Sequence, residues 1–226
     1  DAYAAVLQST DGVANNDSVN PTQAQYAALG VNGVDTAQEE SLLGDVLDTA
    51  SRNGVSTNAA AVDTVPKIQA LANAVQNVMD GDATKAELES LGITGVTTEN
   101  LAAVQAALAA ATDATQLDTL PHVQAVVNAA VSAYNTAAAK IAAYAQDDGA
   151  AAATDASKIP VLADYTDLGV VGIGGAGQPT VAMINSALAD PDITGTLADQ
   201  RSEVQAIVDA YAAVLQSTDG VANNDS

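Results

Sequence analysis

Three glycines form the pattern with the clearest chemical meaning in this sequence. Gly172, Gly174 and Gly177 make a G-x-G-x-x-G match ahead of a predicted helix over 180–188, and such a match binds pyrophosphate in dinucleotide-binding folds. That fold also needs a buried strand before the glycines and a second strand–helix–strand unit. Period-2 alternation is nearly absent here, so we interpret the glycines as an enlarged turn.

The other reactive side chains do not form a catalytic set. His122 is the only histidine and there is no cysteine, which excludes a His or Cys metal cluster and a catalytic triad. With 28 acidic residues, adjacent carboxylates are expected by chance, and acid–base catalysis needs buried ones in a pocket. We expect a solvated surface for the pairs Glu39–Glu40, Asp147–Asp148 and Asp190/Asp192.

These observations predict that the chain is not an enzyme. No residue is assigned a catalytic, cofactor-binding or metal-ligating role, and no cofactor is expected. His122 aligns with Lys67 in a repeat described below, so we expect it to be an exposed residue in the first turn of a helix.

The charge balance limits the partners. A net charge of −22 repels phosphate backbones and anionic lipid, so we expect neither nucleic-acid binding nor membrane insertion. Carboxylates suit weak Ca²⁺ binding, and the stretches 11–17 and 80–82 carry carboxylate and amide groups at predicted junctions. Neither follows the D-x-[DN]-x-[DN]-G loop, and turn formation is a sufficient explanation of both. Adaptation to high salt is another explanation of the acidity.

The elements that must position all these residues come in repeats. The segment Asp1–Ser18 (DAYAAVLQSTDGVANNDS) recurs unchanged at Asp209–Ser226, at an offset of 208 residues. We interpret this offset as the period of a longer tandem array, of which the chain holds one period and an overlap. We expect a monomer whose partners are the neighbouring repeat copies.

A weaker repeat divides the period into three. The turns Leu29–Val34 (LGVNGV), Leu91–Val96 (LGITGV) and Leu168–Ile173 (LGVVGI) match, and each follows a short run in which Tyr26, Leu88 and Tyr165 align. Downstream, Ile68-Gln69-Ala70, Val123-Gln124-Ala125 and Val204-Gln205-Ala206 align. We predict modules at 19–82, 83–149 and 150–226, and we assign 1–18 to the preceding copy.

Composition and punctuation predict that each module is helical. The runs are rich in Ala, Leu, Gln and Glu, which favour helices, and apolar residues in the long runs follow helical spacing. Gly30, Gly92 and Gly169 stand where a first helix would end in a left-handed C-cap. Thr36-Ala37-Gln38-Glu39 reads as a capping box, Thr97 or Thr98 begins the corresponding helix, and Pro66 and Pro121 read as first-turn prolines.

The predicted fold is therefore all-α, with three consecutive three-helix-bundle modules arranged as an elongated tandem array. We expect third helices of roughly 20 to 28 residues, or about 30–42 Å. The short junction Met79–Ala83 should hold two modules in a fixed relation, whereas Gln146–Ser157 and Ser9–Pro21 are candidate hinges. The recurring tyrosines should pack in the core with their hydroxyls at its rim.

The order P-T-x-x-x-Y-x-x-L-G-V-x-G-V, then a helix, then VQAIVDAYAAVL resembles the helical tandem-repeat stalks of giant bacterial RTX-type surface adhesins. The resemblance covers essentially the whole chain and rests on structural motifs. It implies secretion, an extracellular place at the bacterial cell surface, and a role as a spacer that projects a binding domain, as in biofilm adhesins. The alternative is a protein-binding helical module that captures a host or matrix protein. A binding module should repeat exposed apolar positions across the three modules, whereas a spacer should repeat only core positions.

Overall fold

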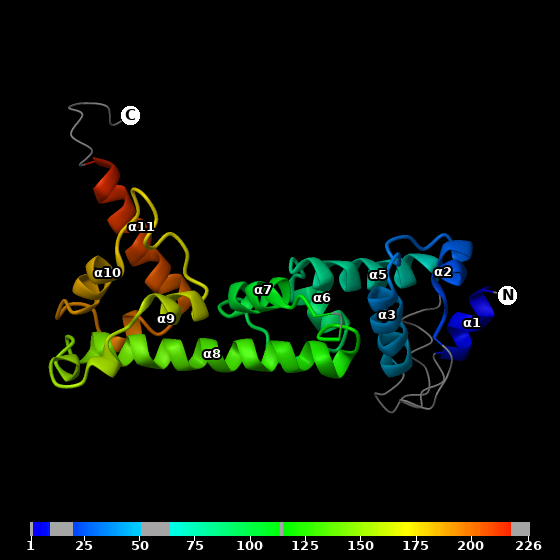
Figure 1. Ribbon diagram of the computed structural model, residues 1–226, viewed down its shortest axis with the longest axis horizontal. Coiled ribbons are helices and arrows are strands. Elements are labelled where there is room, and N and C mark those ends of the chain that lie inside the picture. Colours follow the sequence, from blue (N-terminus) through cyan, green and yellow to red (C-terminus); the bar gives the residue numbers. More distant parts are fainter. Residues whose placement is uncertain (1, 10–19, 51–63, 114, 218–226) are drawn as a thin grey trace. The chain divides into compact units, whose positions relative to one another are not determined.

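The computed structural model describes residues 2–9, 20–50, 64–113 and 115–217. They are predominantly helical and contain no strand (Figure 1), so the all-α prediction is confirmed. The chain divides into two compact units, Asp1–Ala129 and Ala130–Ser226. The division falls inside the longest helix, so the segment 83–149 contributes to both units.

Unit 1 is built from short helices and the first turns of that longest helix. In chain order they are α1 (Ala2–Ser9), α2 (Gln23–Leu29), α3 (Ala37–Ala50), α5 (Val65–Asp80), α6 (Lys85–Ser90), α7 (Leu101–Ala110) and the start of α8 (Leu120–Gln146). Helix α3 packs on α5, which also contacts α6 and α7, while α1 contacts α2 and α3. The α3 carboxylate of Asp45 accepts a 2.6 Å hydrogen bond from the backbone N–H of Leu120, the first residue of α8.

Unit 2 contains the rest of α8 and the last three α-helices. These are α9 (Leu162–Asp167), α10 (Val181–Leu188) and α11 (Arg201–Ser217), with 3₁₀ turns at η1 (Ala151–Ala153), η2 (Ala156–Lys158) and η3 (Gly195–Leu197). The expected length of the third helices holds for α8, with 27 residues, but is wrong for α5 and α11, with 16 and 17. Helix α5 stops early because Gly81 takes a left-handed conformation (φ 76°) as its C-cap.

The predicted helix boundaries are largely confirmed. Gly30, Gly92 and Gly169 have φ values of 81°, 88° and 78°. Thr36 and Glu39 form the predicted capping box, with Thr36 N donating to Glu39 Oε2 at 2.8 Å and Glu39 N donating to Thr36 Oγ1 at 3.2 Å. In the next segment the expected start at Thr97 or Thr98 is wrong, because α7 begins at Leu101 with Asn100 as its N-cap. The Thr97 hydroxyl accepts from Asn100 N at 3.2 Å and closes the turn that leads into α7.

The junction at Met79–Ala83 is closely packed, as expected of a fixed connection. A Cβ added to Gly81 would lie 2.8 Å from the backbone of Ala109 in α7. The side chain of Ala83 is 0% exposed. Gln105 Nε2 donates to the Ala83 carbonyl oxygen at 3.1 Å, so α7 holds the chain on both sides of the turn.

Of the two candidate hinges, the structure describes Gln146–Ser157 but little of Ser9–Pro21. Within Gln146–Ser157, the Asp147 carboxylate accepts from the backbone N–H groups of Gly149 and Ala151 at 3.0 and 3.1 Å. That segment is therefore a series of hydrogen-bonded turns, and its action as a hinge stays a prediction. The candidate hinge at Ser9–Pro21 lies almost entirely outside the described residues.

The cores are built from aliphatic side chains and include two tyrosines that are completely buried. Tyr26 and Tyr165 are both 0% exposed, so the prediction that they pack in the core is confirmed. The prediction that their hydroxyls lie at the rim is wrong. The Tyr165 hydroxyl donates to the buried Asn185 amide oxygen, and the Tyr26 hydroxyl is buried without a partner among the described residues.

Candidate functional site

A glutamine on each long helix binds the backbone of the turn that follows each first helix. In the first copy, the Gln69 side chain accepts from Asn32 N at 2.8 Å and donates to Asn32 O at 2.9 Å. One side-chain amide thus forms hydrogen bonds with both the N–H and the C=O of one backbone residue, as a neighbouring β-strand would. Gln69 Nε2 also donates to Asn73 Oδ1 at 2.7 Å, which orients the amide.

The same arrangement, which we call the glutamine clamp, occurs three times. Gln124 accepts from Thr94 N at 2.9 Å and donates to Thr94 O at 3.1 Å. Gln205 does the same with Val171, again at 2.9 and 3.1 Å. The residue four positions later orients the amide in each copy, through Asn128 Oδ1 and Asp209 Oδ1, both at 2.9 Å.

The backbone of each clamped turn is also the same. The residue after the C-cap glycine donates its N–H to the carbonyl oxygen five residues earlier, from Val31 to Tyr26, Ile93 to Leu88 and Val170 to Tyr165, at 2.9–3.0 Å. A second glycine then takes a left-handed φ in every copy, at Gly33 (78°), Gly95 (87°) and Gly172 (84°). Two left-handed residues three apart explain why the L-G-x-x-G pattern recurs, since L-residues adopt this conformation at a cost.

The glutamine clamp was not predicted from the sequence. Gln69, Gln124 and Gln205 align in the repeat, but a recurring glutamine on a helix is also typical of a solvated face. The signal that could have identified it is the asparagine or aspartate four residues later in each copy, at Asn73, Asn128 and Asp209. Together these residues form a site whose chemistry is neutral hydrogen bonding to backbone, which stabilises a turn.

The glycine-rich stretch after the third clamp is a closed turn. Gly174 N donates to the Pro179 carbonyl oxygen at 2.9 Å, and Gly175 N donates to Gln178 Oε1 at 2.9 Å. The Thr180 hydroxyl caps α10 by accepting from Met183 N at 3.3 Å. A nucleotide-binding loop directs such glycine N–H groups at phosphate, whereas here those of Gly174 and Gly175 have partners inside the loop. No strand precedes them in the described part of the chain.

The histidine and the acidic pairs contribute to local structure. His122 is exposed in the first turn of α8, as expected, with Nδ1 lying 2.6 Å from Asp118 Oδ1. The expectation of a solvated surface is wrong for Glu39, which is only 7% exposed. Its carboxylate accepts from the backbone N–H of Asp35 and of Thr36, and its burial follows from that role in capping α3.

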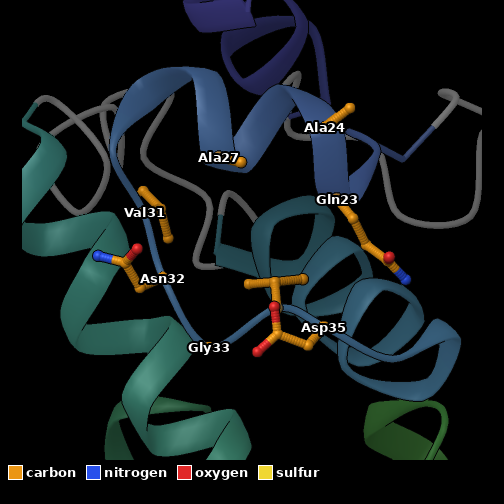
Figure 2. A pocket seen from close by; sticks show the side chains of 8 residues that line it. Gln23, Ala24, Ala27, Val31, Asn32, Gly33 and Asp35 are labelled. Atoms are coloured by element: carbon orange, nitrogen blue, oxygen red, sulfur yellow. The ribbon is translucent and has the colours of Figure 1, made fainter.

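A pocket of about 360 Å³ lies between α2 and the first clamped turn. It is lined by Gln23, Ala24, Ala27, Val31, Asn32, Gly33, Val34 and Asp35. Figure 2 shows the side chains of Gln23 and Asn32 on opposite sides of this pocket, so its polar groups do not converge. Small-molecule sites instead combine apolar walls with polar groups aimed at one point.

No group of three or more His, Cys, Asp or Glu side chains in the described segments is arranged to hold a metal ion. The stretch 11–17 lies outside those segments, while Asp80 and Asp82 are exposed beside the C-cap Gly81. Calcium at the junctions therefore stays a prediction. None of the described helices combines the length and the apolar character that crossing a membrane requires.

The electrostatics of the buried tyrosines support a packing role. Burial raises the pKa of both phenols above the ordinary value, and the charge of Glu40 raises the pKa of Tyr26 further. Both hydroxyls are therefore neutral throughout the physiological range, and the one on Tyr165 serves as a hydrogen-bond donor.

Comparisons with known proteins add no relative. No protein-family model matches the chain, and neither a curated protein nor a solved structure shows significant similarity to it.

Proposed function

We propose that this chain is a spacer segment of a tandem-repeat bacterial cell-surface adhesin, secreted and extracellular, that extends a binding domain away from the cell. The observation that carries the proposal is the unchanged recurrence of 18 residues at an offset of 208. A spacer needs only a backbone structure that can be repeated along the chain. Contacts between neighbouring repeats stabilise such arrays.

The pattern of repetition inside the period supports this function. The clamp glutamines, the paired glycines and the buried positions recur in all three copies. Some exposed positions vary: exposed Val171 corresponds to Asn32 and Thr94 in the other two turns. The exposed positions that recur include small alanines, as at Ala24, Ala86 and Ala163. Selection for a frame rather than for a repeated binding face would produce this pattern.

Small-angle X-ray scattering on chains of one, two and three periods tests the proposal. The maximum dimension should grow nearly in proportion to the number of periods. A maximum dimension that grows only as the cube root of the mass, as in a compact globule, would contradict the spacer function.

A second function, protein binding, is favoured by one observation in unit 2. Val161, Leu162 and Val171 are 50%, 50% and 65% exposed, and the aligned residues of the first two copies are all polar. Exposed apolar side chains of this size are typical of interaction surfaces when they cluster. Pull-down from host-cell or biofilm-matrix extracts, with V161T/L162Q/V171N as the matched control, would favour this function if a partner is lost with the substitutions.

A further inference from the structure

The two copies of one short sequence have different surroundings in this structure. Residues Ala2–Ser9 form α1, and the identical residues Ala210–Ser217 form the last two turns of α11. Val6 is 0% exposed, whereas its counterpart Val214 is 57% exposed. Because the local sequences are the same, the difference comes from the surroundings, and among the described elements α2 and α3 contact α1 (Figure 1).

The covered side of α1 is well defined. Ala2 and Ala5 are half-buried and Val6 is buried, and their spacing of three and four residues places them on one side of the helix. The counterparts in α11 are Ala210, Ala213 and Val214, and all of them are exposed.

Helix α11 packs on its own unit through its first turns. Val204 and Val208 are buried, and Ile207 and Tyr211 are half-buried. At about 100° per residue, Val214 lies close to the direction of Ile207, seven residues earlier. The apolar stripe of this helix therefore continues into its last turns, where Val214 is exposed.

We propose that Ala210, Ala213 and Val214 form a docking face through which α11 of one copy packs on α2 and α3 of the next copy of this chain. There α11 takes the place that α1 occupies here. The last helix of each copy is then shared, with its first turns in unit 2 and its last turns in unit 1 of the following copy. This inference deepens the proposed function and rests on its tandem arrangement, because it specifies how consecutive copies meet.

The experiment compares one valine in its two settings. In the chain as it stands, Val6→Asp should lower the hydrogen-exchange protection of α2 and α3 at least tenfold. Val214→Asp should leave every helix of unit 1 unchanged and serves as the matched control, since both substitutions place a charge in the same local sequence.

A two-copy chain then carries the decisive variant. It continues from Ser226 directly into a second copy of residues 19–226, and only the second copy carries ¹⁵N, so that mass distinguishes its peptides. Val214→Asp at the junction should now lower the protection of the second copy's α2 and α3 at least tenfold. The same substitution in the last α11 should remain silent.

Two results would overturn the inference. One is unchanged protection of the second copy's α2 and α3 in the junction variant. The other is unchanged protection in the Val6→Asp chain, which would show that the α1 contact does not stabilise unit 1. The outcome is separable from the proposed function, because the scattering experiment can show proportional growth while the junction variant is silent, or the reverse.

Discussion

Residues 22–33 of unit 1 and 161–172 of unit 2 share a backbone but differ in their buried polar groups. Both regions have the five-residue turn bond, two left-handed glycines and a glutamine clamp. In the core of unit 2, the Tyr165 hydroxyl donates to Asn185 Oδ1. Asn185 Nδ2 donates in turn to the Pro160 carbonyl oxygen at 2.9 Å. The aligned Tyr26 hydroxyl has no partner among the described residues.

The caps of the two first helices differ in the same way. Helix α2 has a neutral capping box of Thr22 and Gln25. At α9 the Asp164 carboxylate accepts from Val161 N and pairs with Lys140 Nζ, both at 2.7 Å. The comparison teaches that backbone hydrogen bonds define the frame, while the side chains packed inside it can change from copy to copy.

The largest difference between the two regions should come from their tyrosines. Tyr165→Phe is expected to lower the free energy of unfolding by about 1–3 kcal/mol, because the buried Asn185 oxygen loses its donor. Tyr26→Phe should change it by less than about 0.5 kcal/mol, since no partner is lost. Urea denaturation followed by circular dichroism measures both, and equal losses in the two variants would contradict the comparison.

The first and third clamps are expected to contribute equally to stability, and a charged substitution of the glutamine should separate them. Gln69→Ala and Gln205→Ala should each lower stability by about 1–2 kcal/mol, because each removes two hydrogen bonds to a turn residue. Gln→Glu keeps the shape of the side chain but removes the donor. Gln205→Glu should then be the more damaging, because it faces Asp209 where Gln69→Glu faces Asn73. Exchange of the Asn32 and Val171 amides reports each turn, and a larger effect at Asn32 would refute this account.

The second glycines should both be sensitive to substitution, because both have a left-handed backbone. A Cβ at Gly33 would also lie 3.0 Å from Gln76 Oε1, at the end of a flexible side chain. Gly33→Ala and Gly172→Ala are each expected to lower stability by about 1–2 kcal/mol. A Cβ at Gly172 would meet Val208 Cγ1 at an ordinary 3.7 Å, so the loss there is backbone strain. Asparagine tolerates this conformation better, so Gly172→Asn is the control and should lose less than alanine in the same urea titration. A neutral Gly172→Ala would contradict the argument.

The smallest expected effect is a pH dependence of stability at the N-terminal cap of α6, in the second of the three aligned segments. Hydrogen bonds from the Thr84 backbone N–H, the Thr84 hydroxyl and Asn77 hold the pKa of Glu87 below its usual value. Since the folded pKa is the lower one, this stabilisation is present above about pH 4.5 and is lost as the pH falls through the folded value. The partly exposed group contributes only a few tenths of a kcal/mol.

The hydroxyl cap at α10 is the internal control for that effect. On acidification the protection factors at the start of α6 should fall more than those at the start of α10, where the Thr180 cap does not titrate. Glu87→Gln should abolish the difference. If the difference persists in that variant, the pH dependence has another source.

Much of the secondary structure could be predicted because its causes are local. The left-handed caps at Gly30, Gly92 and Gly169 and the box at Thr36 and Glu39 depend on residues within five positions of one another. Repetition helped as well, because the sister turns identified Gly172 as a turn glycine rather than part of a nucleotide site.

Contacts between distant residues could not be predicted. The clamps join residues that are 37, 30 and 34 positions apart, and a helical pattern does not say which turn a surface glutamine meets. Glu39 was expected to be solvated, because its burial depends on how α3 packs. The short α5 followed from Gly81, whose turn is confined by Ala109 of α7.

The sequence by itself determined the all-α class, the helix caps and the recurrence of Asp1–Ser18 at Asp209–Ser226, since these depend on residue type and short spacing. Only the tertiary structure decided that Val6 is covered and Val214 exposed, that Tyr165 has a partner, and that Gln69 binds Asn32. Identical local sequences cannot encode different environments. What separates the two copies is packing, which depends on the elements that each one meets.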